Sequence, residues 1–312
     1  MIARVPPPSA LASVGALLAS ALAIANCTGY SADSPMPGNP LTQGMTNSAA
    51  KSALRNDNTF SAQLGHEYYA LADYSVSGQD WVDADYFARK SLAASKGEVA
   101  PPEDNRNWGI PEQATRGTRD EMEQQRQRLL AALNGGGKEK YPVLAAQAQT
   151  RYDCWVERSE ANLQAEFRGV CHRQFLATLS DLEVLLHPPG PYNAYFPFDG
   201  RTLGDEAEQQ VSQAAATIPQ AGTARAKVVA WADRSGSPDY NMKLAQARAD
   251  AVRAKLVADG MADNRIDEEV KGESDVPVPT PDGVREPRNR LVQISAEVPP
   301  DTASGSSTPP IH

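Results

Sequence analysis

Apolar residues in the first half of the chain recur every three or four positions, which is the spacing of amphipathic helices. Five runs with this spacing fall between residues 59 and 186, with a loop at 97–111 and a glycine triplet at 135–137 that ends the third run. In the last run the apolar side chains are Cys171, Phe175, Leu179, Leu182 and Leu186. The pattern therefore predicts an all-helical domain over residues 59–186.

The periodicity changes after residues 187–191, a cluster of prolines around one glycine that interrupts regular structure. Beyond it, alternating apolar and polar positions predict short strands, and helical spacing predicts two helices between them. The expected strands are 192–199, 227–232, 266–270 and 292–298, and the expected helices are 203–218 and 244–256. This β-α-β-α-β-β order predicts a small α+β domain over 190–298, with both helices on one face of the sheet.

Both flanks of these domains have compositions that are poorly suited to a packed core. Residues 27–58 are polar and interrupted by proline and glycine, and we expect a disordered tether there. Residues 299–312 are rich in proline, serine and threonine, and we expect a disordered tail.

Residues 1–26 have the features of an export signal. Arg4 is the only charged residue before Asp33, and the run from Leu11 to Ala25 is apolar or small. This run is too short to cross about 30 Å of hydrocarbon comfortably, but it suits the apolar core of a signal peptide. An N-terminal membrane anchor is the alternative interpretation.

The end of this segment, LAIANC, resembles a bacterial lipobox, whose cysteine becomes the lipidated first residue. The resemblance implies a lipid on Cys27 and attachment to the periplasmic face of the outer membrane, because Thr28 stands where Asp would disfavour outer-membrane sorting. Asn26 departs from the small residue that usually precedes the cysteine. Cleavage after Ala21-Leu22-Ala23 is the alternative, and it would leave a soluble periplasmic protein.

Cys154 and Cys171 are the two cysteines outside the leader segment. Export into an oxidising compartment favours a disulfide between them, and closing a loop of this size contributes about 3 kcal/mol to stability in the loop-entropy model. A reactive thiol pair is the alternative, but the two residues lack CxxC spacing.

The composition of the chain argues against nucleic acid as a partner and against metal as a cofactor. The 312 residues include 30 Lys and Arg against 39 Asp and Glu, so the net charge of −9 argues against nucleic acid as the main partner. Four His and three Cys argue against a Cys/His-rich metal protein. We therefore expect no metal and no cofactor.

Candidate binding chemistry gathers after the expected second strand, where Asp233 precedes a turn at 236–238. Asp239 is the expected N-cap of the next helix, and Asn241 and Arg248 fall on one face of that helix. Such a site could hold a zwitterion, with the acid on the ammonium and the guanidinium on the carboxylate. A surface ion pair worth about 0–1 kcal/mol is the alternative interpretation.

The same stretch resembles the peptidoglycan-binding C-terminal domain family of outer-membrane protein A, which also occurs in peptidoglycan-associated lipoprotein and in MotB. The family pattern is T-D-x-x-G…N-x-x-L-S-x-x-R-A…G-x-G-E…P…N-R-R-V. The matching residues here are Asp233, Gly236, Asn241, Leu244, Arg248, Ala249, Gly272, Glu273, Pro277, Asn289, Arg290 and Val292. Departures from the pattern include Ala232, Ala245 and Leu291, and the charges of Asp233 and Arg248 are both kept.

The resemblance implies that Asp233 and Arg248 clamp the ammonium and carboxylate of diaminopimelate in the peptidoglycan stem peptide. It also implies that Asn241, Arg290 and the loop containing Asp199 and Gly200 line the pocket. The expected function is a non-catalytic link between the outer membrane and the cell wall.

Two alternatives involve the helical domain, parts of which look similar to the N-terminal regions of some OmpA-family proteins. It could dock an envelope protein, which would make the chain a scaffold, although the aromatic residues between Tyr68 and Phe87 fit a core better than a binding surface. A wall-targeted enzyme is less expected, because His66-Glu67 lacks HExxH spacing and no GxSxG motif occurs.

Overall fold

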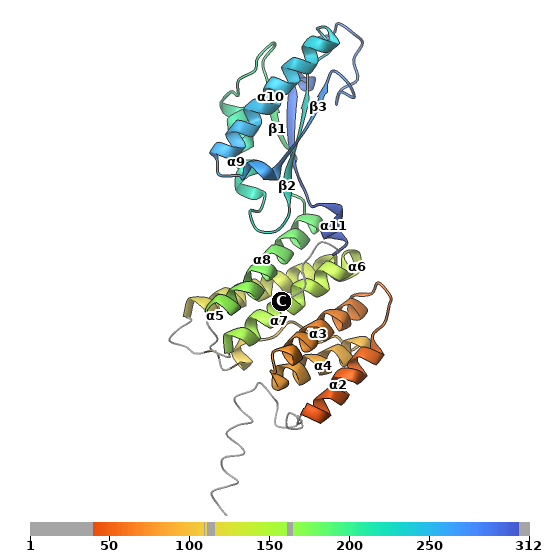
Figure 1. The fold of residues 1–312 in the computed structure, drawn as a ribbon. Coiled ribbons are helices and arrows are strands. Elements are labelled where there is room, and N and C mark those ends of the chain that lie inside the picture. Colours follow the sequence, from red (N-terminus) through yellow and green to blue (C-terminus); the bar gives the residue numbers. More distant parts are fainter. Residues whose placement is uncertain (1–39, 109, 111–115, 161–164, 306–312) are drawn as a thin grey trace, which may run out of the picture.

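The computed structural model describes residues 40–108, 110, 116–160 and 165–305. They form a helical part joined end to end to a smaller part that contains the sheet (Figure 1). This arrangement confirms the predicted α+β fold class with its helices first. The predicted signal peptide at 1–26 and Cys27 lie outside the described residues. No helix within the described ranges is long and apolar enough to cross a membrane.

Five long helices of the first part match the five runs of helical spacing. They are α3 (Phe60–Ser77), α4 (Trp81–Ser95), α5 (Arg116–Ala132), α7 (Pro142–Glu160) and α8 (Ala165–Leu186). The third run ends as predicted in a π turn at Leu133–Gly137, where Gly136 has φ 106°. The short helix α6 (Lys138–Lys140) follows, and η1 (Asn105–Asn107) lies within the predicted loop.

The core of the helical part is built from these helices and is rich in aromatic side chains. Tyr68 and Phe87 are buried and stacked, with ring centroids 6.2 Å apart, as the core interpretation of the aromatic run predicts. Cys154 on α7 and Cys171 on α8 form a disulfide with a Cα–Cα distance of 5.9 Å, which confirms the predicted pairing. The bond joins α7 to α8, which pack against each other.

A buried charged network fixes the loop between α4 and α5 against this core. Lys90 Nζ donates to Asp153 Oδ2 at 2.7 Å and to Glu103 Oε1 at 2.5 Å, while Tyr68 OH also donates to Asp153. Burial alone would lower the pKa of Lys90, but Asp153, Tyr68 and Glu103 raise it well above its usual value. Lys90 therefore remains charged and holds two acids in place.

The two predicted disordered flanks contain short ordered elements. Helix α2 (Pro40–Ala53) lies in the predicted tether, packs on α4 and buries Ala50 completely, so the tether prediction is wrong for these residues. Helix α11 (Pro300–Ala303) lies in the predicted tail, packs on α8 and buries Thr302. Both segments are mostly polar in sequence, which is why their composition predicted disorder.

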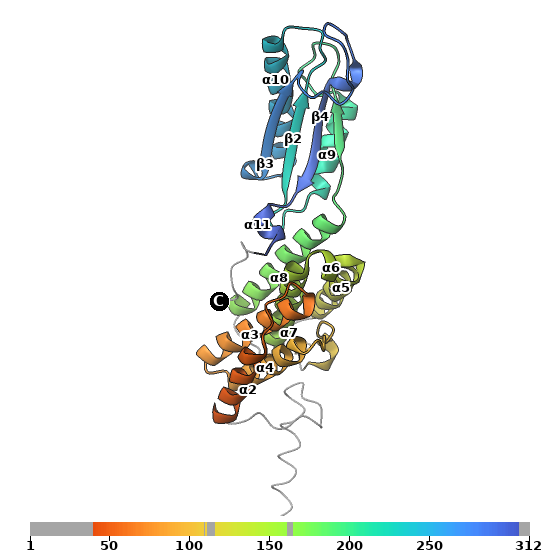
Figure 2. The ribbon, with the colours of Figure 1, turned by 90° about the vertical axis from the view of Figure 1, so that its right-hand side faces the viewer.

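The second part is a four-stranded sheet with two helices on one face (Figure 2). Its strands lie in the order β1-β4-β2-β3, with β2 parallel to β3 and the other pairs antiparallel. The alternation is clear along β2, where Ala226, Val228 and Ala230 are buried under the helices. The elements are β1 (Tyr192–Tyr195), α9 (Asp205–Thr217), β2 (Arg225–Trp231), α10 (Pro238–Ala258), η3 (Asp263–Arg265), β3 (Ile266–Gly272), η4 (Pro287–Asn289) and β4 (Leu291–Glu297).

The two parts meet where α8 reaches the turn before β2, a contact that we call the joint. Asp181 of α8 accepts the backbone N–H of Thr223 at 2.8 Å and that of Ala224 at 3.1 Å. The Thr223 hydroxyl bonds the hydroxyl of Thr302 in α11 at 3.0 Å. Residues of α8, of the β2 turn and of α11 are therefore linked by polar contacts across the joint.

Candidate functional site

The predicted binding residues lie at the end of the sheet that points away from the helical part (Figure 1). Strand β2 ends there and α10 begins there, so a backbone turn and a helix N-terminus meet at one place. Ser237 caps α10 by accepting the Tyr240 N–H at 3.3 Å, and Asp239 lies one position inside the helix after Pro238. The predicted N-cap at Asp239 is therefore wrong by two residues.

Asp233 is the buried acid of this site and is only 4% exposed. Its Oδ2 lies 3.2 Å from Nη1 of Arg290, and its Oδ1 accepts the Ser235 hydroxyl at 2.6 Å. Arg290 also donates from Nε to the Phe196 carbonyl at 3.0 Å. The direct ion-pair partner of Asp233 is therefore Arg290, which the sequence analysis placed only in the pocket lining.

Arg248 is completely buried, at 0% exposure, and points back toward the strand ends as predicted. Its guanidinium donates to three backbone carbonyls: from Nε to Gly200 at 2.9 Å, from Nη1 to Trp231 at 3.3 Å, and from Nη2 to Pro197 at 3.3 Å. Burial lowers the pKa of Arg248 to about 10, although the charge of Asp233 opposes that shift. Arg248 therefore stays protonated at neutral pH and holds the loop after β1 against the end of β2.

The structure thus gathers Asp233, Arg248 and Arg290 at one end of the sheet. Asp233 acts on Arg248 through its charge, but no direct ion pair joins these two side chains among the described residues. The alternative of a surface Asp233–Arg248 ion pair is therefore wrong. Since three donors of Arg248 serve carbonyls, two of its five N–H groups remain for other acceptors.

Asn241 is buried but does not point to the same place as Asp233. Its Nδ2 donates to Glu273 Oε2 at 2.5 Å, which ties α10 to the end of β3. A Cβ added to Gly236 would lie 2.9 Å from Asn241 Oδ1, so this turn needs glycine to pass the amide. Asn241 is therefore bonded to the residue after β3 and packs closely against the Gly236 turn.

The loop after β1 forms the exposed rim of the site. Asp199 has φ 56°, is exposed and accepts a hydrogen bond from the Tyr240 hydroxyl, while Gly200 supplies the carbonyl that Arg248 binds. Phe198 is 49% exposed, and Arg285 from the β3–β4 loop stacks on its ring at 4.0 Å. Aromatic and charged side chains therefore surround the buried charges.

Asn289 and Glu273 are two positioning residues to which the sequence analysis assigned no role. Asn289 is fully buried and bonds both the N–H and the carbonyl of Val278, at 2.8 and 2.7 Å, which fixes the long β3–β4 loop. Glu273 receives the Asn241 amide. Both residues belong to the quoted family motifs. Their place in those motifs, rather than any local pattern, could have identified them as positioning residues.

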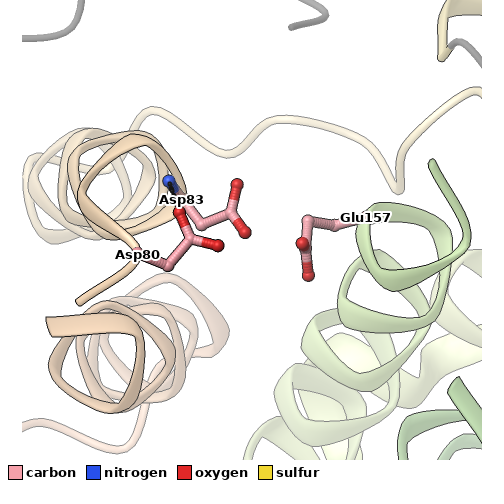
Figure 3. A group of neighbouring side chains, drawn as sticks. All are labelled: Asp80, Asp83 and Glu157. Atoms are coloured by element: carbon pink, nitrogen blue, oxygen red, sulfur yellow. Dashed lines mark hydrogen bonds between the residues drawn. The ribbon is translucent and has the colours of Figure 1, made fainter. Parts of the chain in front are cut away.

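A second charged group lies between α4 and α7, where Asp80, Asp83 and Glu157 offer carboxylate oxygens within 4.8 Å of one another (Figure 3). Carboxylates are ligands that Ca²⁺ and Mg²⁺ accept, so this group has suitable donors for such an ion. However, burial and the contact with Glu157 raise the pKa of Asp83 to about 10, and Arg158 Nε lies 3.2 Å from Glu157 Oε2. A proton and an arginine thus relieve the repulsion between these acids.

Comparison with known proteins gives matches to the sheet part of the chain. Residues 195–290 match the OmpA family. An outer membrane protein of Gluconacetobacter diazotrophicus is 35% identical over 113 residues, covering 34% of this chain and 30% of that protein. Outer membrane protein A of Bordetella avium is 34% identical over 102 residues, covering 33% of this chain and 53% of that protein.

A probable lipoprotein of Escherichia coli, YiaD, is 25% identical over 141 residues, which cover 45% of this chain and 62% of that protein. The chain therefore spans less than two thirds of each of these relatives. Among solved structures, the peptidoglycan-associated lipoprotein from Burkholderia pseudomallei is 24% identical with a TM-score of 0.32, covering 34% of this chain and 90% of that chain.

Proposed function

We propose that this protein, whose residues 195–290 form an OmpA-family domain, binds peptidoglycan without catalysis and links the outer membrane to the cell wall. The observation that carries the proposal is the convergence of Asp233, Arg248 and Arg290 beside the N-terminus of α10. Opposite charges held a short distance apart at a helix N-terminus suit a zwitterion. The ligand proposed is the diaminopimelate of the stem peptide.

The ammonium of diaminopimelate would form an ion pair with the Asp233 carboxylate. The carboxylate of diaminopimelate would accept hydrogen bonds from the N–H groups of Arg290 and Arg248. Because Arg248 is fully buried and bonded to the carbonyls of Pro197 and Gly200, the loop at 196–201 must move outward when the ligand enters. Binding should therefore change the environment of Tyr240, whose hydroxyl is bonded to Asp199 in that loop.

Retention on purified sacculi tests the proposal. Asp233→Asn and Arg290→Gln should each lower retention about tenfold or more, since a hydrogen bond to a charged group is worth about 1.5–3 kcal/mol. Asp267→Asn is a matched control, because this acid is paired with Arg225 on β2 rather than with site residues. Thermal melts check that each variant is folded, and equal retention of wild type and both site variants would overturn the proposal.

Competition identifies the ligand within the wall. Free meso-diaminopimelate should release the protein from sacculi, whereas pimelate, which has the same carbon chain and both carboxylates but no ammonium group, should not. Release by both compounds or by neither would refute the assignment to diaminopimelate. Such a result would not refute wall binding, which the retention assay tests separately.

Attachment to the membrane is proposed to occur through a lipid on Cys27. The similarity to a probable lipoprotein supports it, and the periplasmic face of the outer membrane is then the location. Mass spectrometry of the mature N-terminus tests it, because lipidated Cys27 and a free terminus at Ile24 differ by the acyl chains and three residues.

The absence of catalysis is also part of the proposal. His66 Nε2 lies 2.9 Å from the Arg55 carbonyl, and Glu67 accepts the Gln147 amide at 3.2 Å. Both side chains that the sequence analysis considered for an enzyme therefore form hydrogen bonds within the helical part. Release of soluble muropeptides from sacculi by the pure protein would contradict this part.

A further inference from the structure

A cavity of about 260 Å³ lies at the joint, at the opposite end of the sheet from Asp233. Its walls come from α7, α8, α11 and the turn before β2, which are neighbours in Figure 2. Pockets for drug-sized ligands measure about 300–1,000 Å³, so a cavity of this size suits a smaller molecule. The wall is mostly apolar where Leu144 and Ala177 form it.

The charged groups of the cavity are mainly cationic. Arg151 is 3% exposed, donates to the Thr178 hydroxyl, and has its pKa lowered to about 10 by burial despite the charge of Glu67. Arg173 is exposed, and no hydrogen bond or ion pair with a described residue engages its guanidinium. Asp181 is the one acid in the lining, and its carboxylate accepts the N–H groups of the β2 turn. The cavity therefore favours an anion.

One polar atom of the lining also requires a donor. Gln174 Oε1 is buried and has no hydrogen-bond partner among the described residues. A buried acceptor left without a partner costs about 1–3 kcal/mol, so a ligand that supplies an N–H group gains that amount on binding. One cavity thus combines three features: cations that can bind a carboxylate, an acceptor that can bind an N–H group, and an apolar wall.

We infer that the joint cavity binds a small α-amino or α-amido carboxylate with an apolar side chain. Arg173 and Arg151 face its carboxylate, Gln174 Oε1 accepts its N–H group, and Leu144 with Ala177 contacts its side chain. This chemistry belongs to a free amino acid and equally to the last residue of a peptide. The ligand would touch α8 and the β2 turn together, so it would strengthen the contact between the two parts.

The chain itself offers one segment that could compete with the ligand. The described residues end at Gly305, whose carbonyl accepts the Gln147 amide of α7 at 3.4 Å, and Gln147 lies one helical turn before Arg151. Residues 306–312 follow in the sequence and carry an apolar side chain at Ile311, which suits the apolar wall of the cavity. The experiment must therefore separate a free ligand from this segment.

Calorimetric titration of the full chain with leucine tests the inference, with leucinamide and 4-methylpentanoate as probes that lack the carboxylate and the N–H group respectively. We expect saturable binding of leucine and at least tenfold weaker binding of each probe. Arg173→Ala and Gln174→Leu should each weaken leucine about tenfold, as the loss of one charged or one buried hydrogen bond predicts. Arg128→Ala, which removes an exposed arginine of α5, should leave affinity unchanged.

Ala177→Leu fills the cavity without removing a polar group and should abolish binding while sacculus retention stays at the wild-type level. Higher leucine affinity after truncation at Gly305, together with competition by a peptide of residues 306–312, would support the inference and identify this segment as a competitor for the cavity. Equal affinity after truncation would support a free ligand. Absence of leucine binding in both the full chain and the truncated chain, or binding that Ala177→Leu and Arg173→Ala leave intact, would overturn it.

Discussion

Asp181→Ala is expected to loosen the joint between the two parts of the protein. The carboxylate is buried and accepts backbone N–H groups from Thr223 and Ala224, together with the Thr223 hydroxyl at 3.1 Å. Alanine leaves both backbone donors without a partner. A Cβ at the neighbouring Gly222 would lie 2.7 Å from the Ala177 carbonyl, so the turn is packed too closely to shift freely toward a new partner.

The magnitude follows from those two donors. A buried N–H group without a partner costs about 1–3 kcal/mol, so the substitution should lower the free energy of unfolding by about 2–6 kcal/mol. Asp181→Asn keeps one acceptor oxygen and should cost about half as much. Glu183→Ala is the matched control on the same helix, since its exposed ion pair with Arg128 is worth about 0–1 kcal/mol.

Urea denaturation followed by two probes measures the effect. Trp231 reports on the sheet part, whereas Trp81, Trp108 and Trp155 report on the helical part, so a Trp231→Phe background isolates the helical signal. The two transitions should separate in Asp181→Ala because the parts no longer stabilise each other. A variant that stays within about 0.5 kcal/mol of wild type, with coincident transitions, would refute the reasoning that Asp181 holds the joint.

Three further predictions concern the helical part. Asp83→Asn should raise the free energy of unfolding at neutral pH and make it depend less on pH. In the folded wild type the pKa of this carboxyl is raised from 3.8 to about 10, so the folded state binds the proton more tightly than the unfolded state. Wild type therefore loses stability as the pH rises between these two values. Lys90→Met should cost about 3–5 kcal/mol by leaving Asp153 buried without its cation, and adding Asp153→Asn should recover part of the loss. Replacing Cys154 and Cys171 with alanine should cost about 3 kcal/mol in denaturant titrations.

Each of these predictions has a result that contradicts it. Asp73→Asn changes the same charge at an exposed position, so an equal gain there would show that net charge rather than the buried carboxyl is responsible. A double variant of Lys90 and Asp153 no more stable than Lys90→Met would argue against charge as the origin of the cost. Unchanged stability after reduction of the wild-type disulfide would contradict the third prediction.

Periodicity predicted most of the fold, because the helices and strands that form the cores carry a regular apolar face. The run from Cys171 to Leu186 and the alternation along β4 show this directly. Helices α2 and α11 escaped prediction because each lies in a mostly polar segment, and the buried residues described there, Ala50 and Thr302, are small and form no regular apolar pattern.

The candidate site was predicted in its residues but not in its pairing. Asp233 and Arg248 could be placed at the same end because one ends a strand and the other lies on the helix that follows. The ion pair between Asp233 and Arg290 depends on β4 lying directly beside β2, a contact between residues 57 positions apart. Local spacing carries no information about that contact, so the partner of Asp233 could be identified only from the assembled sheet.

The end-to-end arrangement of the two parts has a mechanical consequence. Helix α2 and the loops around Asp233 lie at opposite extremities (Figures 1 and 2), and α8, at about 1.5 Å per residue, forms the strut between them. If the wall pulls on one extremity and a membrane holds the other, tension passes through the single connection at residues 187–191 and through Asp181 beside it. A ligand in the joint cavity would then strengthen the contact between the two parts. Without it, tension would separate the parts at the joint while the sheet part stays bound to the wall.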